Sequence, residues 1–132
     1  MVAPLYVDTS ALVAVLFDEP GAAKVKRALR AATQVFAANL LEAELRSAAA
    51  RERVDAVAVD AVLAGLSWVC PSRSLGSECA NILRVGYLRG ADLWHLACAS
   101  YLSQVLAPVA ILTLDDRQRE VAVAAGLRLA RV

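Results

Sequence analysis

Short apolar runs alternate with longer stretches of helical composition along the whole chain, and this alternation limits the possible folds more than any other feature. The run Leu5–Val7 comes first, and the helix-start residues 8–10 follow it at once. Its length and composition are typical of a strand buried on both faces. Strands that alternate with helices predict a mostly parallel sheet with helices on both sides. At 132 residues, we expect one domain spanning residues 1–132.

The predicted elements follow one another without a repeat, a linker or a low-complexity tract. Strands are predicted at about residues 5–7, 34–37, 67–70, 109–114 and 127–132. Helices are predicted at about residues 10–17, 22–32, 39–53, 55–65, 75–87, 91–102 and 115–125. Asn39 and Asp55 are predicted to cap the third and fourth helices, Gly90 to separate the fifth from the sixth, and Gly126 to end the last.

The composition raises the question of a membrane protein, because 59% of the residues are hydrophobic and the mean hydropathy is +0.54. Charged residues, however, interrupt every apolar stretch before the roughly 18 to 20 residues that a spanning helix needs. The N-terminus has no basic segment and carries an acid within its first apolar stretch, which is unlike a secretory signal. We therefore expect a cytoplasmic protein whose apolar excess serves a dense core or an interface with an oligomer or partner.

Neither the cysteines nor the net charge points to a function. The three cysteines, Cys70, Cys79 and Cys98, lack the paired spacing of a zinc site, so we expect buried, reduced thiols and no disulfide. The net charge is +1, so only local basic groups could attract a polyanion. The predicted helix 22–32 carries such groups, which equally fit a plain solvated face: Lys24, Lys26, Arg27 and Arg30.

Four acidic residues stand where an apolar segment ends or becomes amphipathic: Asp8, Glu44, Asp92 and Asp115. Strand ends and helix starts of a parallel sheet meet in one crevice, so we predict that these acids converge. Together they offer only oxygen ligands, without a Cys or His pair, which suits Mg²⁺ or Mn²⁺ better than zinc. Crowded carboxylates raise one another's pKa, and a bound cation would relieve their repulsion.

Each acid also has a plainer interpretation when it is taken alone. Asp8 and Asp92 fit ordinary positions at a helix N-terminus, where the helix dipole favours an acid. Glu42 and Glu44 are two residues apart on one predicted helix and cannot both face the core. Glu42 has Arg46 four residues on, as in a surface ion pair, whereas Glu44 has apolar neighbours on its own face. A carboxylate there needs a cation or a buried arginine, so we predict Glu44 to be the functional acid.

Several polar residues are candidates for supporting roles. Asp115 repeats the strand-then-acid pattern, and the adjacent Asp116 is either an assisting acid, the main fourth acid or a helix cap. Thr113 lies two residues before Asp115 on the same side of the strand and can hydrogen-bond a ligand carboxylate, as can Ser10. The sole histidine, His95, is either a metal ligand or a buried wall histidine.

Four stretches of the sequence resemble the small PIN-domain ribonucleases and, among them, the VapC-type toxins of bacterial toxin–antitoxin pairs. The stretches are YVDTSAL, NLLEAELRSA, RGADLWHLACA and LTLDDRQREVAVAAGL, which follow the family's order and spacing and cover nearly the whole chain. The resemblance implies an α/β fold, a three-layer α/β/α sandwich around a mostly parallel sheet of about five strands. It also implies a ribonuclease that uses Mg²⁺ or Mn²⁺, forms a homodimer and is inhibited by a small cognate antitoxin protein.

The resemblance also assigns roles to residues of this chain. The metal-binding catalytic acids are then Asp8, Glu44, Asp92 and Asp115, with Thr113, Ser10 and Asp116 in support. Specificity for one RNA would come from basic groups around the crevice, such as Arg46, Arg89 and Arg117. A PIN-like module that binds RNA or a partner without cutting is the alternative function. A phosphatase that uses Asp8 as its nucleophile is disfavoured, because Ser10 stands where such enzymes have a second Asp.

Overall fold

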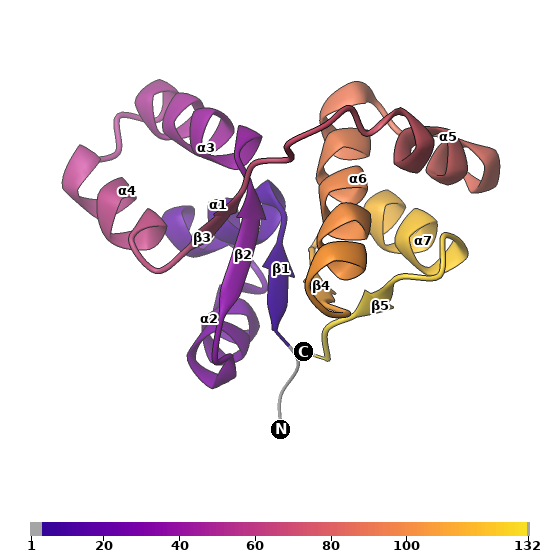
Figure 1. The fold of residues 1–132 in the computed structure, drawn as a ribbon. Coiled ribbons are helices and arrows are strands. Elements are labelled where there is room, and N and C mark those ends of the chain that lie inside the picture. The colour runs from indigo at the N-terminus through magenta and orange to yellow at the C-terminus, as the bar shows by residue number, and fades with distance from the viewer. Residues whose placement is uncertain (1–3, 132) are drawn as a thin grey trace.

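Five parallel strands form a single sheet in this computed structural model, which describes residues 4–131 (Figure 1). The strands are β1 (Leu5–Val7), β2 (Val35–Ala38), β3 (Ser67–Val69), β4 (Ala110–Leu112) and β5 (Arg128–Leu129). Their order across the sheet is β3-β2-β1-β4-β5, and all four pairings are parallel. The predicted parallel sheet of about five strands is confirmed.

Helices cover both faces of this sheet, so the predicted three-layer α/β/α sandwich is also confirmed (Figure 1). One face carries α1 (Thr9–Phe17), α2 (Ala22–Ala31), α3 (Leu40–Arg51) and α4 (Ala56–Leu63). The other carries α5 (Gly76–Val85), α6 (Gly90–Val105) and α7 (Asp116–Ala124). No helix within residues 4–131 has the length and apolar character that crossing a bilayer requires.

The central strand β1 is buried on both of its faces. Leu5 and Val7 pack into the core formed with α1 to α4, whereas Tyr6 between them packs into the core formed with α6 and α7. This alternation follows from the two-residue period of a strand. After β3 the chain crosses β2 and β1 to reach β4, so the strand order reverses between β1 and β4. Ligands of open α/β sheets bind at the carboxyl ends of strands at such a reversal.

Some predicted boundaries are wrong. Residues 113 and 114 lie beyond the end of β4, and β5 is only two residues long because it pairs at the sheet edge with β4 alone; residue 132 of that predicted strand lies outside the described residues. The break between α5 and α6 falls at residues 86–89, and Gly90 begins α6 instead of preceding it. Gly126 follows α7 with φ +83°, as predicted for a glycine at a helix end.

Two smaller predictions about single side chains also fail. Asn39 occupies the N-cap position of α3, but its side chain makes no capping hydrogen bond. Its side-chain oxygen instead accepts a hydrogen bond from Trp94 Nε1 at 3.2 Å. Asp55 does cap α4, through a 2.9 Å bond from the amide of Val57. All three cysteines are free thiols, but of the three only Cys98 is buried, whereas Cys79 is partly buried and Cys70 is exposed.

A buried carboxylate fastens the segment after β3 to the helices of the second layer. Glu78 on α5 is 4% exposed and receives two bonds from the guanidinium of Arg73, at 3.1 and 2.7 Å. Gln104 on α6 donates a third at 3.2 Å. The same guanidinium lies 5.2 Å from the ring centre of Tyr101, also on α6. The Arg73 bonds above all lower the pKa of Glu78 from 4.5 to about 2.

We expect Glu78→Gln to destabilise the fold by about 1 kcal/mol at pH 6, because charged hydrogen bonds are lost and half-exposed Arg73 is partly screened by water. A lowered pKa means that this stabilisation is fully present above pH 4.5 and is lost as the pH falls through about 2. Urea unfolding at several pH values between 6 and 2 should therefore show that the difference in unfolding free energy between Glu78→Gln and the native chain shrinks as the pH falls. A gap independent of pH would contradict this role, and the surface variant Glu42→Gln is the control.

Candidate active site

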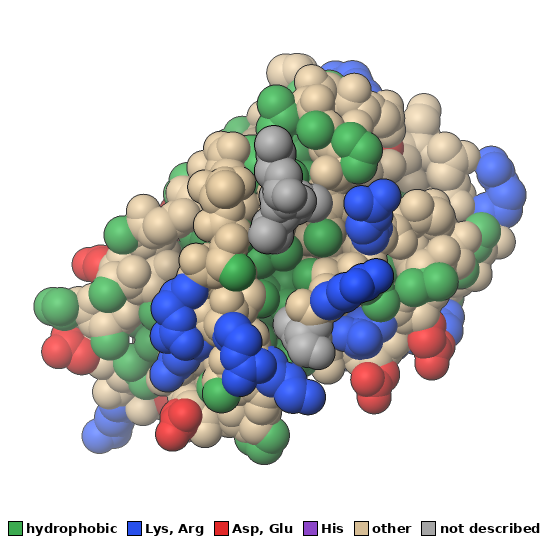
Figure 2. Space-filling model, turned by 90° about the horizontal axis from the view of Figure 1, so that it is seen from below, with side chains coloured by type: hydrophobic (Ala, Val, Ile, Leu, Met, Phe, Trp, Pro, Cys, Tyr) green, Lys and Arg blue, Asp and Glu red, His purple; other side chains and the backbone are tan. Residues whose placement is uncertain are grey.

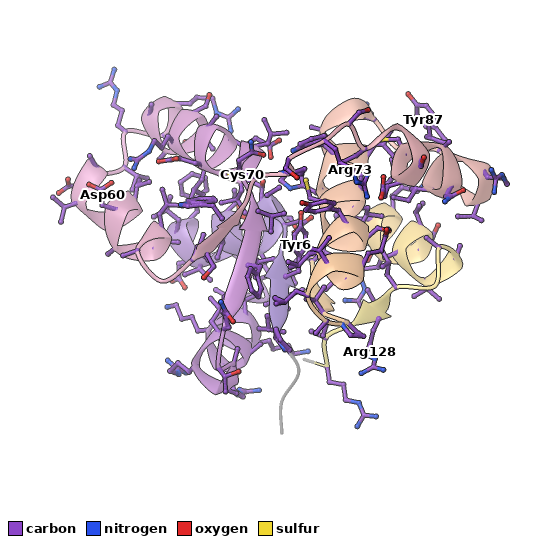
Figure 3. All side chains as sticks on the ribbon, viewed as in Figure 1. Tyr6, Asp60, Cys70, Arg73, Tyr87 and Arg128 are labelled. Atoms are coloured by element: carbon purple, nitrogen blue, oxygen red, sulfur yellow. The ribbon has the colours of Figure 1, made fainter. Side chains whose placement is uncertain are left out.

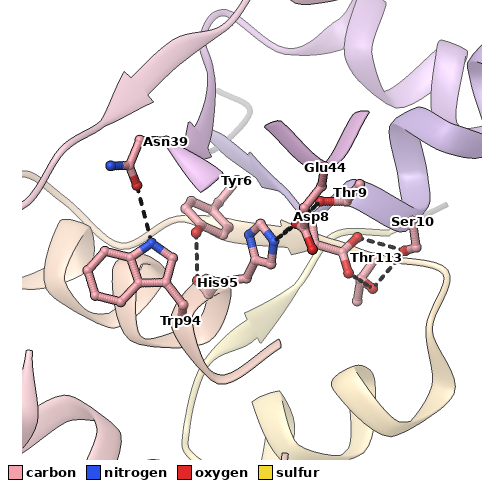
Figure 4. A network of polar contacts seen from close by, with 9 residues as sticks. All are labelled: Tyr6, Asp8, Thr9, Ser10, Asn39, Glu44, Trp94, His95 and Thr113. Atoms are coloured by element: carbon pink, nitrogen blue, oxygen red, sulfur yellow. Dashed lines mark hydrogen bonds and ion pairs between the residues drawn. The ribbon is translucent and has the colours of Figure 1, made fainter. Parts of the chain in front are cut away.

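Asp8 lies directly after β1, at the reversal of strand order, and is only 4% exposed (Figure 4). Its Oδ1 accepts a hydrogen bond from Ser10 Oγ and its Oδ2 one from Thr113 Oγ1, both at 2.7 Å. Asp8 occupies the N-cap position of α1, but its side chain makes no capping hydrogen bond. The plain helix-cap interpretation is therefore wrong, and the carboxylate is turned toward the end of β4.

The two hydroxyl groups that hold Asp8 are themselves held by backbone amides. Ser10 Oγ accepts a bond from the amide of Leu114 at 3.0 Å, and Thr113 Oγ1 accepts one from the amide of Asp115 at 3.1 Å. Because each hydroxyl has a single hydrogen, donation to Asp8 and acceptance from an amide fix its orientation. The carboxylate thus joins the carboxyl ends of β1 and β4 in one arrangement.

Burial raises the pKa of Asp8, and the hydrogen bonds from Ser10 and Thr113 offset part of that effect. A smaller electrostatic effect of His95 also lowers the pKa of Asp8, and no Lys or Arg within residues 4–131 forms an ion pair with Asp8. An ionised carboxylate in such a place costs stability, which a bound cation would restore.

Glu44 reaches across the carboxyl end of the sheet from α3 to a histidine on α6 (Figure 4). Its Oε1 lies 2.5 Å from His95 Nε2 and accepts a 2.6 Å hydrogen bond from Thr9 Oγ1. The His95 contact lowers the pKa of Glu44 more than its partial burial raises it. The expected buried arginine is absent from the described contacts of Glu44, and an imidazole compensates this carboxylate instead.

His95 is 2% exposed and is fixed from two directions. Its carbonyl oxygen accepts a 2.6 Å bond from the hydroxyl of Tyr6 on β1, and its Nε2 faces Glu44. With the Nε2 hydrogen donated to Glu44, Nδ1 of a neutral ring is an acceptor, and it has no partner among the described residues. His95 is therefore a buried wall residue that positions Glu44.

Asp92 and Asp115 lie together on a pocket of about 360 Å³ at the same end of the sheet. Asp92 is in the first turn of α6, and its pKa is raised by partial burial and then by the charges of Asp115 and Glu44. Asp115 caps α7 through a 2.8 Å bond from the amide of Gln118 to its Oδ1. The neighbouring Asp116 is exposed and is not among the residues of 4–131 that line the pocket.

The four acids share one end of the sheet, but their side chains do not form a ready cage. Among residues 4–131, no three Asp, Glu, His or Cys side chains are arranged to hold one ion. Two hydroxyls hold Asp8, an imidazole holds Glu44, and an amide holds Asp115. Within the same range, no Lys or Arg pairs with any of the four. Carboxylate oxygens that no Lys or Arg neutralises fit Mg²⁺ or Mn²⁺.

Most basic groups lie elsewhere. Arg46 forms ion pairs with Glu42 at 3.1 Å and Asp60 at 3.0 Å, so the predicted surface pair of Glu42 is confirmed and Arg46 is already engaged. The basic residues of α2 are exposed near the opposite end of the sheet, where Lys and Arg side chains gather when the molecule is seen from below (Figure 2). Arg89 and Arg117, by contrast, line the pocket with Asp92 and Asp115.

Comparison with known proteins agrees with the fold. The sequence profile of the PIN domain matches residues 5–124. The chain belongs to the PIN domain family. The resemblance noted in the sequence is thereby confirmed at the level of the family. No curated protein matches the sequence.

Two solved structures are similar to this PIN domain. PAE2754 from Pyrobaculum aerophilum is 16% identical, with a TM-score of 0.61 over 92% of this chain and 87% of the other. VapBC2 from Rickettsia felis, solved bound to a DNA fragment from its promoter, is 12% identical, with a TM-score of 0.62 over 96% and 97% of the two chains. At these identities the likeness shows the fold alone.

The sequence did not indicate the role of Thr9. Its position predicts only a helix-start residue, but its hydroxyl donates a hydrogen bond to Glu44 and lies 3.3 Å from His95 Nε2. The available signal was position, because Thr9 directly follows Asp8 at the carboxyl end of the central strand. His95 had a comparable signal, since it lies one helical turn after Asp92 on the same face of α6.

We expect Asp8→Asn to stabilise this PIN domain in EDTA at pH 7 by about 1 kcal/mol, a size common for single stabilising substitutions. A raised pKa means that the neutral carboxyl stabilises the fold at low pH, and that this contribution is lost as the pH rises through the folded pKa. Asparagine has no charge to bury, so Asp8→Asn should have a higher Tm than the native chain at pH 7. The two Tm values should converge near pH 3. A lower Tm for Asp8→Asn at pH 7 would contradict this account, and exposed Asp60→Asn is the control.

Proposed function

We propose that this PIN domain is a ribonuclease that hydrolyses RNA phosphodiester bonds with Mg²⁺ or Mn²⁺, and that it is the toxin of a type II toxin–antitoxin pair. The observation that carries the proposal is a set of four carboxylates at one end of the sheet without a Lys or Arg partner among the described residues. Fixed negative charge that no Lys or Arg neutralises favours a divalent cation site.

The metal-binding and catalytic residues of this proposal are Asp8, Glu44, Asp92 and Asp115. A divalent ion bound there supplies positive charge against the scissile phosphate and makes hydroxide available near neutral pH. In-line attack would leave a 5′-phosphate and a 3′-hydroxyl. Partial burial and then repulsion by Asp115 and Glu44 raise the pKa of Asp92, and a cation between these acids would relieve the repulsion.

The surrounding residues hold these acids in place. Ser10 and Thr113 orient the two oxygens of Asp8, which keeps one lone pair on each free for a ligand. Thr9 and His95 hold Glu44 in its ionised form, since the His95 contact lowers the pKa of Glu44. Asp116, exposed beside Asp115, is assigned a supporting role through water.

The toxin assignment draws support from likeness to VapBC2, which was solved as a complex on promoter DNA. By analogy we assign this chain a small cognate antitoxin that covers or enters the crevice, a homodimeric state and a cytoplasmic location. The lack of a ready three-ligand cage among the described residues favours one rival, a PIN module that binds RNA without cutting it. Cleavage assays separate the two.

We expect labelled RNA to be cleaved with Mg²⁺ or Mn²⁺ and to stay intact in EDTA. Asp8→Asn, Asp92→Asn and Glu44→Gln should each lower the rate by about 100-fold or more, since even the loss of an outer partner of a metal ligand costs about 10–100-fold. Glu42→Gln is the matched control for Glu44→Gln, because it makes the same change two residues away in a surface ion pair. It should retain the native rate.

Cleavage that persists in EDTA, or that survives both Asp8→Asn and Asp92→Asn, would remove the metal-nuclease proposal. Binding of RNA by the native chain without cleavage in either metal would establish the non-catalytic alternative. DNA of the same sequence belongs in the assay, because none of the proposed residues requires the ribose 2′-hydroxyl.

We also expect expression of the native chain in bacteria to arrest growth, because a ribonuclease without its inhibitor destroys cellular RNA. Asp8→Asn should relieve the arrest at equal protein level, measured by growth curves and immunoblots. Equal arrest by native chain and Asp8→Asn would show that toxicity does not depend on the acid site.

A further inference from the structure

The segment between α5 and α6, residues 86–89, presents a tyrosine to solvent beside the acidic pocket. Gly86 is extended, at φ −179° and ψ 144°, and a Cβ on it would lie 2.8 Å from Val121 Cγ2 on α7. Leu88 is 5% exposed and belongs to the core. In an extended segment alternate residues face the same way, so Tyr87 between them points outward and is 71% exposed (Figure 3).

The backbone of Tyr87 is fixed although its ring is free. Its carbonyl oxygen accepts a 3.2 Å hydrogen bond from Arg117 Nε on α7. Arg117 is held in turn by an ion pair of 3.3 Å with Glu120, one helical turn on. The close seat of Gly86 on Val121 and the burial of Leu88 hold the chain on either side. A large exposed aromatic on a fixed backbone loses little conformational freedom when a flat partner stacks on it.

Two guanidinium groups lie around the same pocket. Arg89 and Arg117 line it together with Tyr87, Leu88, Asp92 and Asp115. Arg89 has no ion-pair partner within residues 4–131, although its charge lowers the pKa of nearby Asp92. Guanidinium groups bind phosphate oxygens in a paired geometry, and aromatic rings stack on bases. One polynucleotide strand carries both partners.

We propose that Tyr87, Arg89 and Arg117 form a binding site for one unpaired nucleotide next to the cleaved bond. Tyr87 stacks on the base, while Arg89 and Arg117 bind the flanking phosphates. A base inside a duplex is already stacked on its neighbours and cannot lie on the Tyr87 ring. The inference rests on the proposed function, because it takes RNA as the ligand of the adjacent acids.

The test is equilibrium binding of a fluorescein-labelled single-stranded RNA of twelve mixed-sequence nucleotides, about 4 kDa, by anisotropy in EDTA at low salt. We expect Tyr87→Ala to weaken binding roughly tenfold. This is toward the lower end of the affinity that is lost when an aromatic side chain under one stacked base is replaced by alanine. Tyr87→Phe should bind as the native chain does, because stacking does not need the hydroxyl. The same RNA annealed to its complement should bind more weakly and be insensitive to Tyr87→Ala.

Arg89→Gln should weaken binding and make the slope of log affinity against log salt shallower by about 0.7, the contribution of one phosphate contact on a single strand. Arg30→Gln on α2 is its control, with the same change of charge on the opposite layer of the sheet. Arg117→Gln is a weaker probe, since it also releases the carbonyl of Tyr87.

Unchanged binding by Tyr87→Ala, no binding by the native chain, or equal sensitivity of duplex and single strand would overturn the proposal. If Tyr87 were instead covered by another protein chain, Tyr87→Ala would change the mass in sedimentation without changing RNA affinity, which overturns it equally. Binding in EDTA is independent of cleavage. If RNA binding depends on Tyr87 but the native chain cuts no RNA, only the nuclease proposal fails. If the native chain cuts RNA but Tyr87→Ala leaves binding unchanged, only this inference fails.

Discussion

Asp8 follows the central strand and is buried from water. Two hydroxyl groups, rather than a Lys or Arg side chain, hydrogen-bond its carboxylate there. The position follows from the sheet. β1 lies between β2 and β4 and is apolar on both faces, so the residue after Val7 emerges among buried neighbours. The same hydroxyls accept amide hydrogens from the chain after β4, which ties the two strand ends together. The hydrogen bonds that orient Asp8 therefore also hold the ends of β1 and β4 together.

Three of the four acids are held by a neutral or weakly basic donor. Hydroxyls serve Asp8, imidazole and a hydroxyl serve Glu44, and a backbone amide serves Asp115. Hydrogen bonds of this kind orient a carboxylate without cancelling its charge, as an arginine would. The pKa of Asp92 is raised by partial burial first and then by the nearby charges of Asp115 and Glu44. Orientation without neutralisation prepares carboxylates for a cation.

The sequence predicted the parts of this site that depend on local pattern. Asp8 and Asp115 were found because an acid directly follows a short apolar strand, and Thr113 because strand residues two apart share a side. Glu44 was separated from Glu42 by helical geometry, with Arg46 four residues from Glu42. The contact between Glu44 and His95 had no such pattern: it joins helices on opposite faces of the sheet across 51 residues of chain. The packing of both helix layers on the sheet brings them together.

The arginines near the crevice follow a different rule from Arg73, which pairs with a buried acid and lowers its pKa to about 2. Arg89 is the N-cap residue of α6, three residues before Asp92, yet the two form no ion pair. Had they paired, each would have satisfied the other, leaving less negative charge for a metal and less positive charge for a phosphate. Arg117 is kept from Asp115 in the same way, because Glu120 and the carbonyl of Tyr87 take its hydrogens. Keeping Arg89 close to Asp92 but unpaired costs stability, and it leaves both charges available to a ligand that carries phosphate and brings a cation with it.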